Sequence, residues 1–170
     1  MGRYMLSLLF LLLPLSAYAQ TGSNVFLGYS YLNADSLAGN RANLNGWNGS
    51  LEGKIFPFVG IVADLSGHYG EQDFGTFTAN THQHTFVFGP RVSVSVGKIR
   101  PFAHYLVGAG HISVNSGGAD TSFAQAIGGG LDYKLIPLIA WRFQGDFLRT
   151  RYFDTKQDNF RFSTGVVLHF

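Results

Sequence analysis

Apolar and polar residues alternate with a period of two along most of this chain. The clearest case is segment 160–170, where one row holds Phe160, Phe162, Thr164, Val166, Leu168 and Phe170. The other row holds Arg161, Ser163, Gly165, Val167 and His169. Successive side chains of a β-strand point to opposite faces, so this pattern predicts a strand whose faces meet different environments.

Eight segments can form strands of this kind: 24–32, 46–55, 59–69, 82–96, 101–113, 122–134, 139–151 and 160–170. Three short turns alternate with four longer polar loops between them, and both ends of the chain fall on the side of the short turns. This layout is typical of an antiparallel up-and-down barrel.

The facing of segment 101–113 stays open. Ala103, Tyr105, Val107 and Ala109 could form its apolar row, but Phe102, Leu106 and Ile112 fall on the same row as His104.

Composition narrows the class of protein. The chain has 170 residues, enough for one domain, with 13% charged residues, 15% aromatic residues and 22 glycines. There is no cysteine, which excludes disulfides and thiolate metal sites. A net charge of +2 gives no reason to expect a nucleic-acid partner. No cofactor is predicted.

The first residues resemble a secretory signal peptide. Arg3 is followed by the apolar run 6–15, which is too short to span a bilayer as a helix. Ala17 and Ala19 then match the small-residue cleavage pattern. We therefore expect a signal peptide at 1–19, removed on export, and a barrel domain at 20–170.

Alternation alone does not say which row faces inward. A soluble lipocalin-like carrier has its apolar row inside, whereas an outer-membrane barrel has it outside. Charged residues concentrate on one row and nearly balance in sign: Glu52, Lys54, Asp64, Arg91, Asp132, Lys134, Arg142, Asp146 and Arg161. The opposite row carries aromatic residues near the strand ends: Tyr29, Tyr31, Trp47, Tyr69, Tyr105, Tyr133, Trp141, Phe160 and Phe170.

Both observations favour an all-β, eight-stranded transmembrane β-barrel with its charges in the lumen. Aromatic girdles are typical of the membrane interfaces, and opposite charges confined in a lumen are expected to pair. The nearest pairs are Glu52 or Asp64 with Arg91, and Asp132 or Asp146 with Arg142, and Arg161 joins them from the closing strand. A lumen filled in this way predicts a plugged barrel, because eight strands enclose only enough space for side chains.

The predicted mature chain resembles the small outer-membrane β-barrel family that includes the OmpA transmembrane domain and OmpX. The resemblance is carried by the signal peptide, by Gly128 to Tyr133 (GGGLDY), by Phe88 to Arg91 (FGPR) and by the row Phe162 to Phe170. It implies a Gram-negative outer membrane, a non-enzymatic structural or surface-interaction role, and contact with lipid, lipopolysaccharide and an extracellular ligand of the loops. The last strand also resembles the signal read by the barrel-assembly machinery, which implies an assembly role for Phe162, Val166, Leu168 and Phe170.

Two histidine motifs suggest other chemistry. His82 and His84 share a strand face as a possible metal pair, but no third ligand lies within sequence reach. His111 and Ser113 resemble the His-x-Ser of outer-membrane lipid A deacylases. That family also needs an acidic residue on the neighbouring strand, where this chain offers only Asp120 in a loop and Asp132 at the far, inward end. A deacylase-like esterase therefore stands as the alternative to a non-enzymatic barrel, with a lipocalin-like carrier third.

Overall fold

The computed structural model describes residues 22–35, 41–73, 78–115, 118–152 and 155–170. The strands are β1 (Ser23–Asp35), β2 (Arg41–Phe56), β3 (Val59–Asp73), β4 (Thr78–Ser93), β5 (Ile99–Val114), β6 (Gly118–Ile136), β7 (Ile139–Tyr152) and β8 (Thr155–His169). No helix long and apolar enough to cross a membrane occurs among these residues. The predicted signal peptide 1–19, with Ala17 and Ala19, lies outside them.

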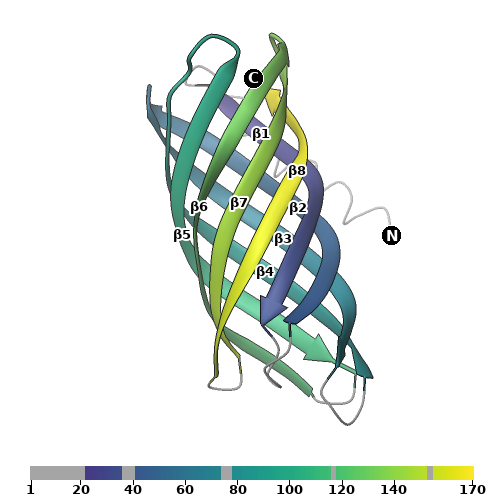
Figure 1. Cartoon of the computed structure of the whole chain (residues 1–170). Helices are drawn as coiled ribbons and strands as arrows, with labels where there is room; N and C mark the ends of the chain where they lie inside the picture. Colours follow the sequence, from purple (N-terminus) through teal and green to yellow (C-terminus); the bar gives the residue numbers. More distant parts are fainter. Residues whose placement is uncertain (1–21, 36–40, 74–77, 116–117, 153–154) are drawn as a thin grey trace, which may run out of the picture.

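The strands form one closed antiparallel barrel in which each pairs with its neighbours in sequence (Figure 1). The barrel closes between β1 and β8, where Val25 is registered with Leu168. Backbone bonds of 2.9 and 3.0 Å between Ser23 and Phe170 continue this closing ladder. The start of β1, the end of β8 and the short turns lie at one end, the upper end in Figure 1. The predicted up-and-down barrel is confirmed.

The two rows of each strand face in opposite directions, and the apolar row faces outward. Leu27 is 63% exposed and Phe147 66% exposed, whereas Glu52, Asp64 and Arg142 are fully buried inside the barrel. This arrangement is the reverse of a soluble carrier, so the lipocalin-like alternative does not describe this barrel.

Strand β5, whose facing the sequence leaves open, follows the same rule. Its row with Tyr105 points outward, while Phe102, Leu106 and Ile112 are buried inside with His104. Phe102 lies inward because two guanidiniums stack on its ring: Cζ of Arg91 lies 4.3 Å from the ring centre and Cζ of Arg142 4.7 Å from it.

The strands extend further from the short turns than the sequence predicts. The predicted loop 33–45 contains the end of β1 and the start of β2, which are in register from Asn33↔Asn43 to Asp35↔Arg41. Asn43 Oδ1 accepts hydrogen bonds from Tyr31 Oη (2.7 Å) and Asn33 Nδ2 (2.8 Å) across the strands. Polar residues on the outward row hide the strand pattern here, although the backbone ladder continues.

The three consecutive glycines of β6 have a packing role. A Cβ at Gly128 would lie 2.2 Å from Asp146 Oδ1, and one at Gly130 would lie 2.0 Å from the carbonyl oxygen of Phe143 and 2.9 Å from the Phe102 ring. Only glycine lets the neighbouring strand and these lumen side chains approach so closely.

Candidate functional site

The lumen nearest the short turns holds a cluster of buried charges centred on Glu52. Its Oε2 accepts a bond of 3.1 Å from Arg91 Nη1, and its Oε1 accepts one of 2.6 Å from Arg100 Nη2. Asn24 Nδ2 donates a further bond of 3.1 Å to the same carboxylate. The carboxylate thus has a charged partner for each oxygen, as a buried anion requires.

A second buried ion pair joins Arg142 of β7 to Asp132 of β6. Arg142 donates to both oxygens of Asp132, from Nε at 2.6 Å and from Nη2 at 2.9 Å. This bidentate geometry is the strong form of an arginine–carboxylate contact. The Arg142 guanidinium also lies 5.0 Å from the ring centre of Phe26, so two aromatic rings and a carboxylate hold it inside the lumen.

Arg161 joins two carboxylates from different walls of the barrel. Its Nη1 lies 2.7 Å from Asp64 Oδ1, and its Nη2 lies 2.6 Å from Asp146 Oδ2. Asp146 also lies 2.7 Å from His104 Nε2, while His104 Nδ1 lies 3.1 Å from Arg91 Nη2. Because a guanidinium only donates, Nδ1 accepts and the ring proton sits on Nε2, which makes His104 a neutral bridge between the two clusters.

Most of the charged residues predicted to line the lumen lie within it. The buried ones are Glu52, Asp64, Arg91, Asp132, Arg142, Asp146 and Arg161. Lys54 is half-buried and Lys134 exposed, so these two do not join the buried network. They sit at strand ends where the barrel opens, and their long stems let the ammonium groups reach water.

The partners differ in part from the predicted ones. Asp64 pairs with Arg161 and not with Arg91, because Asp64 of β3 and Arg161 of β8 point toward each other across the lumen. Asp146 likewise pairs with Arg161, and Arg142 takes Asp132 alone. Sequence reasoning missed Arg100, which stands in a predicted turn, and His104, whose strand had no assigned facing.

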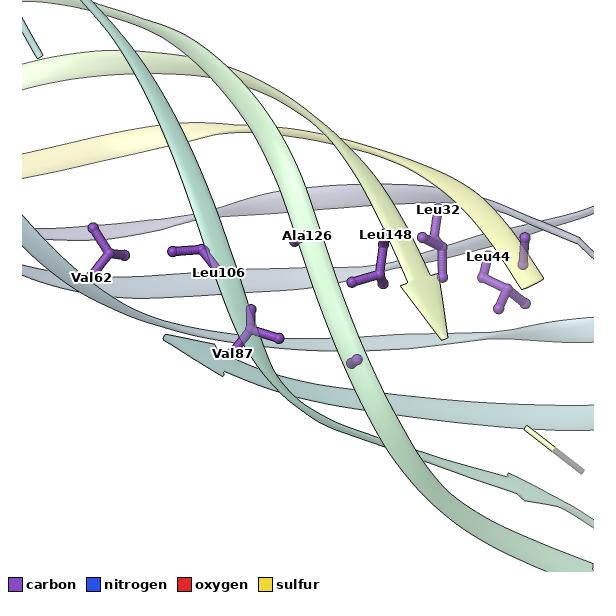
Figure 2. Close-up of a cluster of buried hydrophobic side chains, with 9 residues drawn as sticks. Leu32, Leu44, Val62, Val87, Leu106, Ala126 and Leu148 are labelled. Atoms are coloured by element: carbon purple, nitrogen blue, oxygen red, sulfur yellow. The ribbon is translucent and has the colours of Figure 1, made fainter. Parts of the chain in front are cut away.

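Beyond the charges, a cluster of apolar side chains lies in the lumen among buried polar side chains such as Gln83, Thr85 and Asn159. We call this cluster the apolar plug; its members are Leu32, Ala34, Leu44, Val62, Val87, Leu106, Ala124, Ala126 and Leu148. Every strand from β1 to β7 contributes to it, and Figure 2 shows the labelled side chains following one another along the interior. Each is at most 1% exposed, so side chains occupy this part of the lumen.

The outer surface is apolar between two charged ends. Exposed leucine, isoleucine, valine and aromatic side chains cover the outward rows of all the strands. Beyond this band, at the end away from the short turns, Arg149 Nε donates to Asp158 Oδ1 at 2.6 Å. This hydrogen bond lowers the pKa of Asp158 and raises the pKa of Arg149.

The two histidine motifs meet on this outer surface. Register places His84 opposite His111 and His82 opposite Ser113, and all three imidazoles are exposed. His82 and His84 make edge contacts with the ring of Tyr69, at centroid distances of 5.3 and 5.6 Å. No group of three or more potential ligands in the described part of the chain is arranged to hold a metal ion.

His111 and Ser113 lack the surroundings of a hydrolase. Nδ1 of His111 lies 2.7 Å from Thr121 Oγ1, so a hydroxyl takes the position where an orienting carboxylate would be needed. Asp120 belongs to β6, not to a loop, and stands in register with the inward-facing Ile112. Asp132 is bound to Arg142 inside the lumen. This geometry does not favour the esterase alternative.

The proposed assembly residues lie on the outside of β8. Phe162, Leu168 and Phe170 are exposed, and Val166 is half-buried on the same row. The row is thus available on the outer surface next to the closing seam with β1.

Comparison with solved structures identifies the architecture. Neisserial surface protein A matches with a TM-score of 0.73 and 14% identity, over 86% of this chain and 96% of that one. Ail of Yersinia pestis matches with a TM-score of 0.61 and 15% identity, over 87% and 99%. The N-terminal barrel of Pseudomonas aeruginosa OprF matches with a TM-score of 0.55 and 17% identity, over 89% and 98%.

The fold is that of the small outer-membrane β-barrels. A further solved structure of Ail contains the heparin analogue sucrose octasulfate. No protein-family model matches the sequence, and no curated protein shows significant sequence similarity to it. The likeness therefore rests on the arrangement of the strands.

Proposed function

We propose that this chain is an integral β-barrel of the outer membrane of a Gram-negative bacterium, with a structural or surface-interaction role and a closed lumen. The observation that carries the proposal is the facing of the two rows of each strand: the apolar row points outward and the charged row points into the lumen, the reverse of a soluble barrel. Monomeric soluble proteins rarely expose large contiguous apolar patches, yet this barrel is apolar around its circumference and buries its charges. A bilayer is the environment in which that surface is stable.

The positions of the outward charges support a membrane-spanning band. The exposed charged residues of the outward rows gather at the end away from the short turns: Arg41, Glu71, Arg149, Arg151, Lys156 and Asp158. At the other end, Lys98 of a short turn and Lys134 at the end of β6 are exposed. A transmembrane strand needs about 9–11 residues. Strand β2 has 16 residues and β6 has 19, so the strands cross the hydrocarbon and continue beyond it.

The filled lumen supports a role other than a general pore. The apolar plug and the charge network occupy the interior, leaving the outer ends of the strands as the surface that meets the environment. Lipid and lipopolysaccharide surround the apolar band, and the charged outer end binds an extracellular ligand. Sucrose octasulfate on the structurally similar Ail makes sulfated glycans the first ligands to test at this end. The barrel-assembly machinery recognises the row of Phe162 and Phe170 during insertion.

Membrane fractionation of the expressed full chain tests the proposal. We expect the protein in the outer-membrane fraction, starting at Gln20 after cleavage, with heat-modifiable gel migration. In planar bilayers it should give no porin-sized steady conductance. Solubility without detergent would refute the membrane placement, and a stable large conductance would refute the closed lumen.

A further inference from the structure

The barrel end with the short turns opens into a cavity of about 300 Å³. We call it the short-turn mouth. The charged residues that line it are Lys54, Lys98, Arg100, Asp132 and Lys134, and Asn24 and His169 line it as well. They come from β1, β2, β5, β6, β8 and the turn before β5, so the barrel brings together basic residues that are far apart in sequence.

Two carboxylates bear on the cavity: Asp132 lines it, and Glu52 binds Arg100, which lines it. Both are neutralised by arginines of the lumen. Glu52 is bound by Arg91 and Arg100, and Asp132 receives two bonds from Arg142. Glu52 and Asp132 therefore present little uncompensated negative charge to the lysines that line the cavity. Arg100 also lines the cavity, and its buried Nε has no hydrogen-bond partner among the described residues.

Three ammonium groups remain at the rim. The register Ile99↔Tyr133 continues to Lys98 and Lys134, whose backbones are joined by a bond of 2.8 Å from Lys134 N to Lys98 O. Like charges directly opposite on paired strands are destabilising. Lys54 Nζ donates a bond of 3.0 Å to the neutral carbonyl oxygen of Pro57.

None of these lysines forms an ion pair with a carboxylate in the part of the chain described by the structure. The turn holds this arrangement in place. Gly97 has φ of +61°, a conformation that favours glycine, and Val96 and Ile99 exchange backbone bonds of 2.8 and 3.1 Å around it. Lys98 thus stands at the tip of a tight hairpin, directly beside Lys134. Two lysines whose backbones are held side by side, without a carboxylate partner and next to a cavity, are an arrangement that an anionic ligand stabilises.

We propose that the short-turn mouth binds a small phosphate-bearing anion. A phosphate offers several acceptor oxygens and can meet Lys54, Lys98 and Lys134 together, whereas a carboxylate offers two. The cavity is at the lower end of the size range of small-molecule sites, which suits a phosphorylated glycerol and not an acyl chain. Ala140, which is buried on the inward row of β7, lines the same cavity and offers an apolar contact to the carbon atoms of such a ligand.

This chemistry has two sources, a soluble phosphate ester or the headgroup of an anionic phospholipid. The first arm of the experiment titrates glycerol 3-phosphate into the full chain in nanodiscs of phosphatidylcholine and follows backbone amide shifts at the mouth by NMR. The second arm compares the same amides in nanodiscs with and without phosphatidylglycerol. Shifts in the first arm indicate a soluble ligand, and shifts in the second arm alone indicate the lipid headgroup; either result supports the phosphate site.

The decisive variant is Lys98→Gln/Lys134→Gln, and its matched control is Arg151→Gln/Lys156→Gln, which removes two exposed positive charges at the opposite end. The mouth variant should weaken binding by about tenfold or more, the loss expected from a single charge-assisted bond. It should also unfold at no lower urea concentration than the native protein, because it relieves repulsion. No shifts in either arm, or equal weakening by the control variant, would overturn the proposal.

Discussion

Replacement of Arg161 by methionine tests the central claim about the lumen. The guanidinium is fully buried and bonds to Asp64 at 2.7 Å and to Asp146 at 2.6 and 2.9 Å. Methionine keeps much of the side-chain volume but leaves both carboxylates short of their charged partner. Asp64 would retain Asn48 at 3.0 Å, and Asp146 would retain His104 at 2.7 Å. Breaking one buried pair costs about 3–5 kcal/mol, so we expect a loss of at least that size.

The measurement is a urea titration of the folded barrel in lipid vesicles, followed by the fluorescence of Trp47 and Trp141. Arg149→Met is the matched control, because Arg149 also binds a carboxylate at 2.6 Å, but both side chains of that pair are more than half exposed. Exposed pairs add little to stability, so the control should unfold at nearly the native urea concentration.

A further variant neutralises the two carboxylates, of Asp64 and Asp146, that lose their partner in Arg161→Met. Adding Asp64→Asn and Asp146→Asn to Arg161→Met removes the unpaired buried charges, so part of the lost stability should return. If Arg161→Met and Arg149→Met shift the unfolding midpoint equally, the lumen charges are solvated and the account of a closed, paired interior is wrong.

Three further outcomes follow from the structure. Leu65→Arg, on the outward row of β3, should lower the free energy of unfolding in a bilayer by about 2–4 kcal/mol. Glu71→Arg, on the same row beyond the apolar band, should lower it far less. Equal urea midpoints for the two variants would contradict the membrane placement. Leu106→Ala in the apolar plug should cost about 2–5 kcal/mol by the same titration, and a native-like midpoint would show that the plug is loosely packed. Because the folded pKa of Asp158 is lowered, its bond to Arg149 supports the β7–β8 end above the unfolded pKa and is lost as pH falls through the folded value. Amide protection there, corrected for the intrinsic exchange rate at each pH, should therefore fall in acid, and Arg149→Met should abolish that change.

Alternation was enough to predict eight strands and, in all but segment 101–113, to divide their residues into two rows. The charged row and the aromatic row then fix the orientation without any structure. Strand ends were harder to predict. Near Asn43 the outward row is as polar as a loop, so only the backbone register with Asn33 reveals the continuing ladder.

The contacts inside the lumen depend on information that the sequence does not display. Arg161 and Asp64 are 97 positions apart and meet only after the barrel has closed. Phe102 shares its row with Leu106, Ile112 and His104, so the sequence does not show that it faces the lumen, where Arg91 and Arg142 stack on its ring. Arg100 precedes a proline at a turn, and nothing local distinguishes it from a solvated surface residue.

The cross-lumen pairs constrain the barrel in a way that the backbone ladders do not. Arg161 of β8 reaches Asp64 of β3, and Arg100 of β5 reaches Glu52 of β2, so each pair joins strands that share no ladder. A register slip of one residue would turn a whole strand's charges outward, and a slip of two would separate the guanidiniums from their carboxylates. Buried ion pairs add little net stability compared with apolar packing, but each wrong register leaves a charge unpaired and is penalised. The charges therefore select one closed register, while the apolar plug adds packing among the buried polar side chains, such as Gln83 and Asn159, that share this part of the lumen.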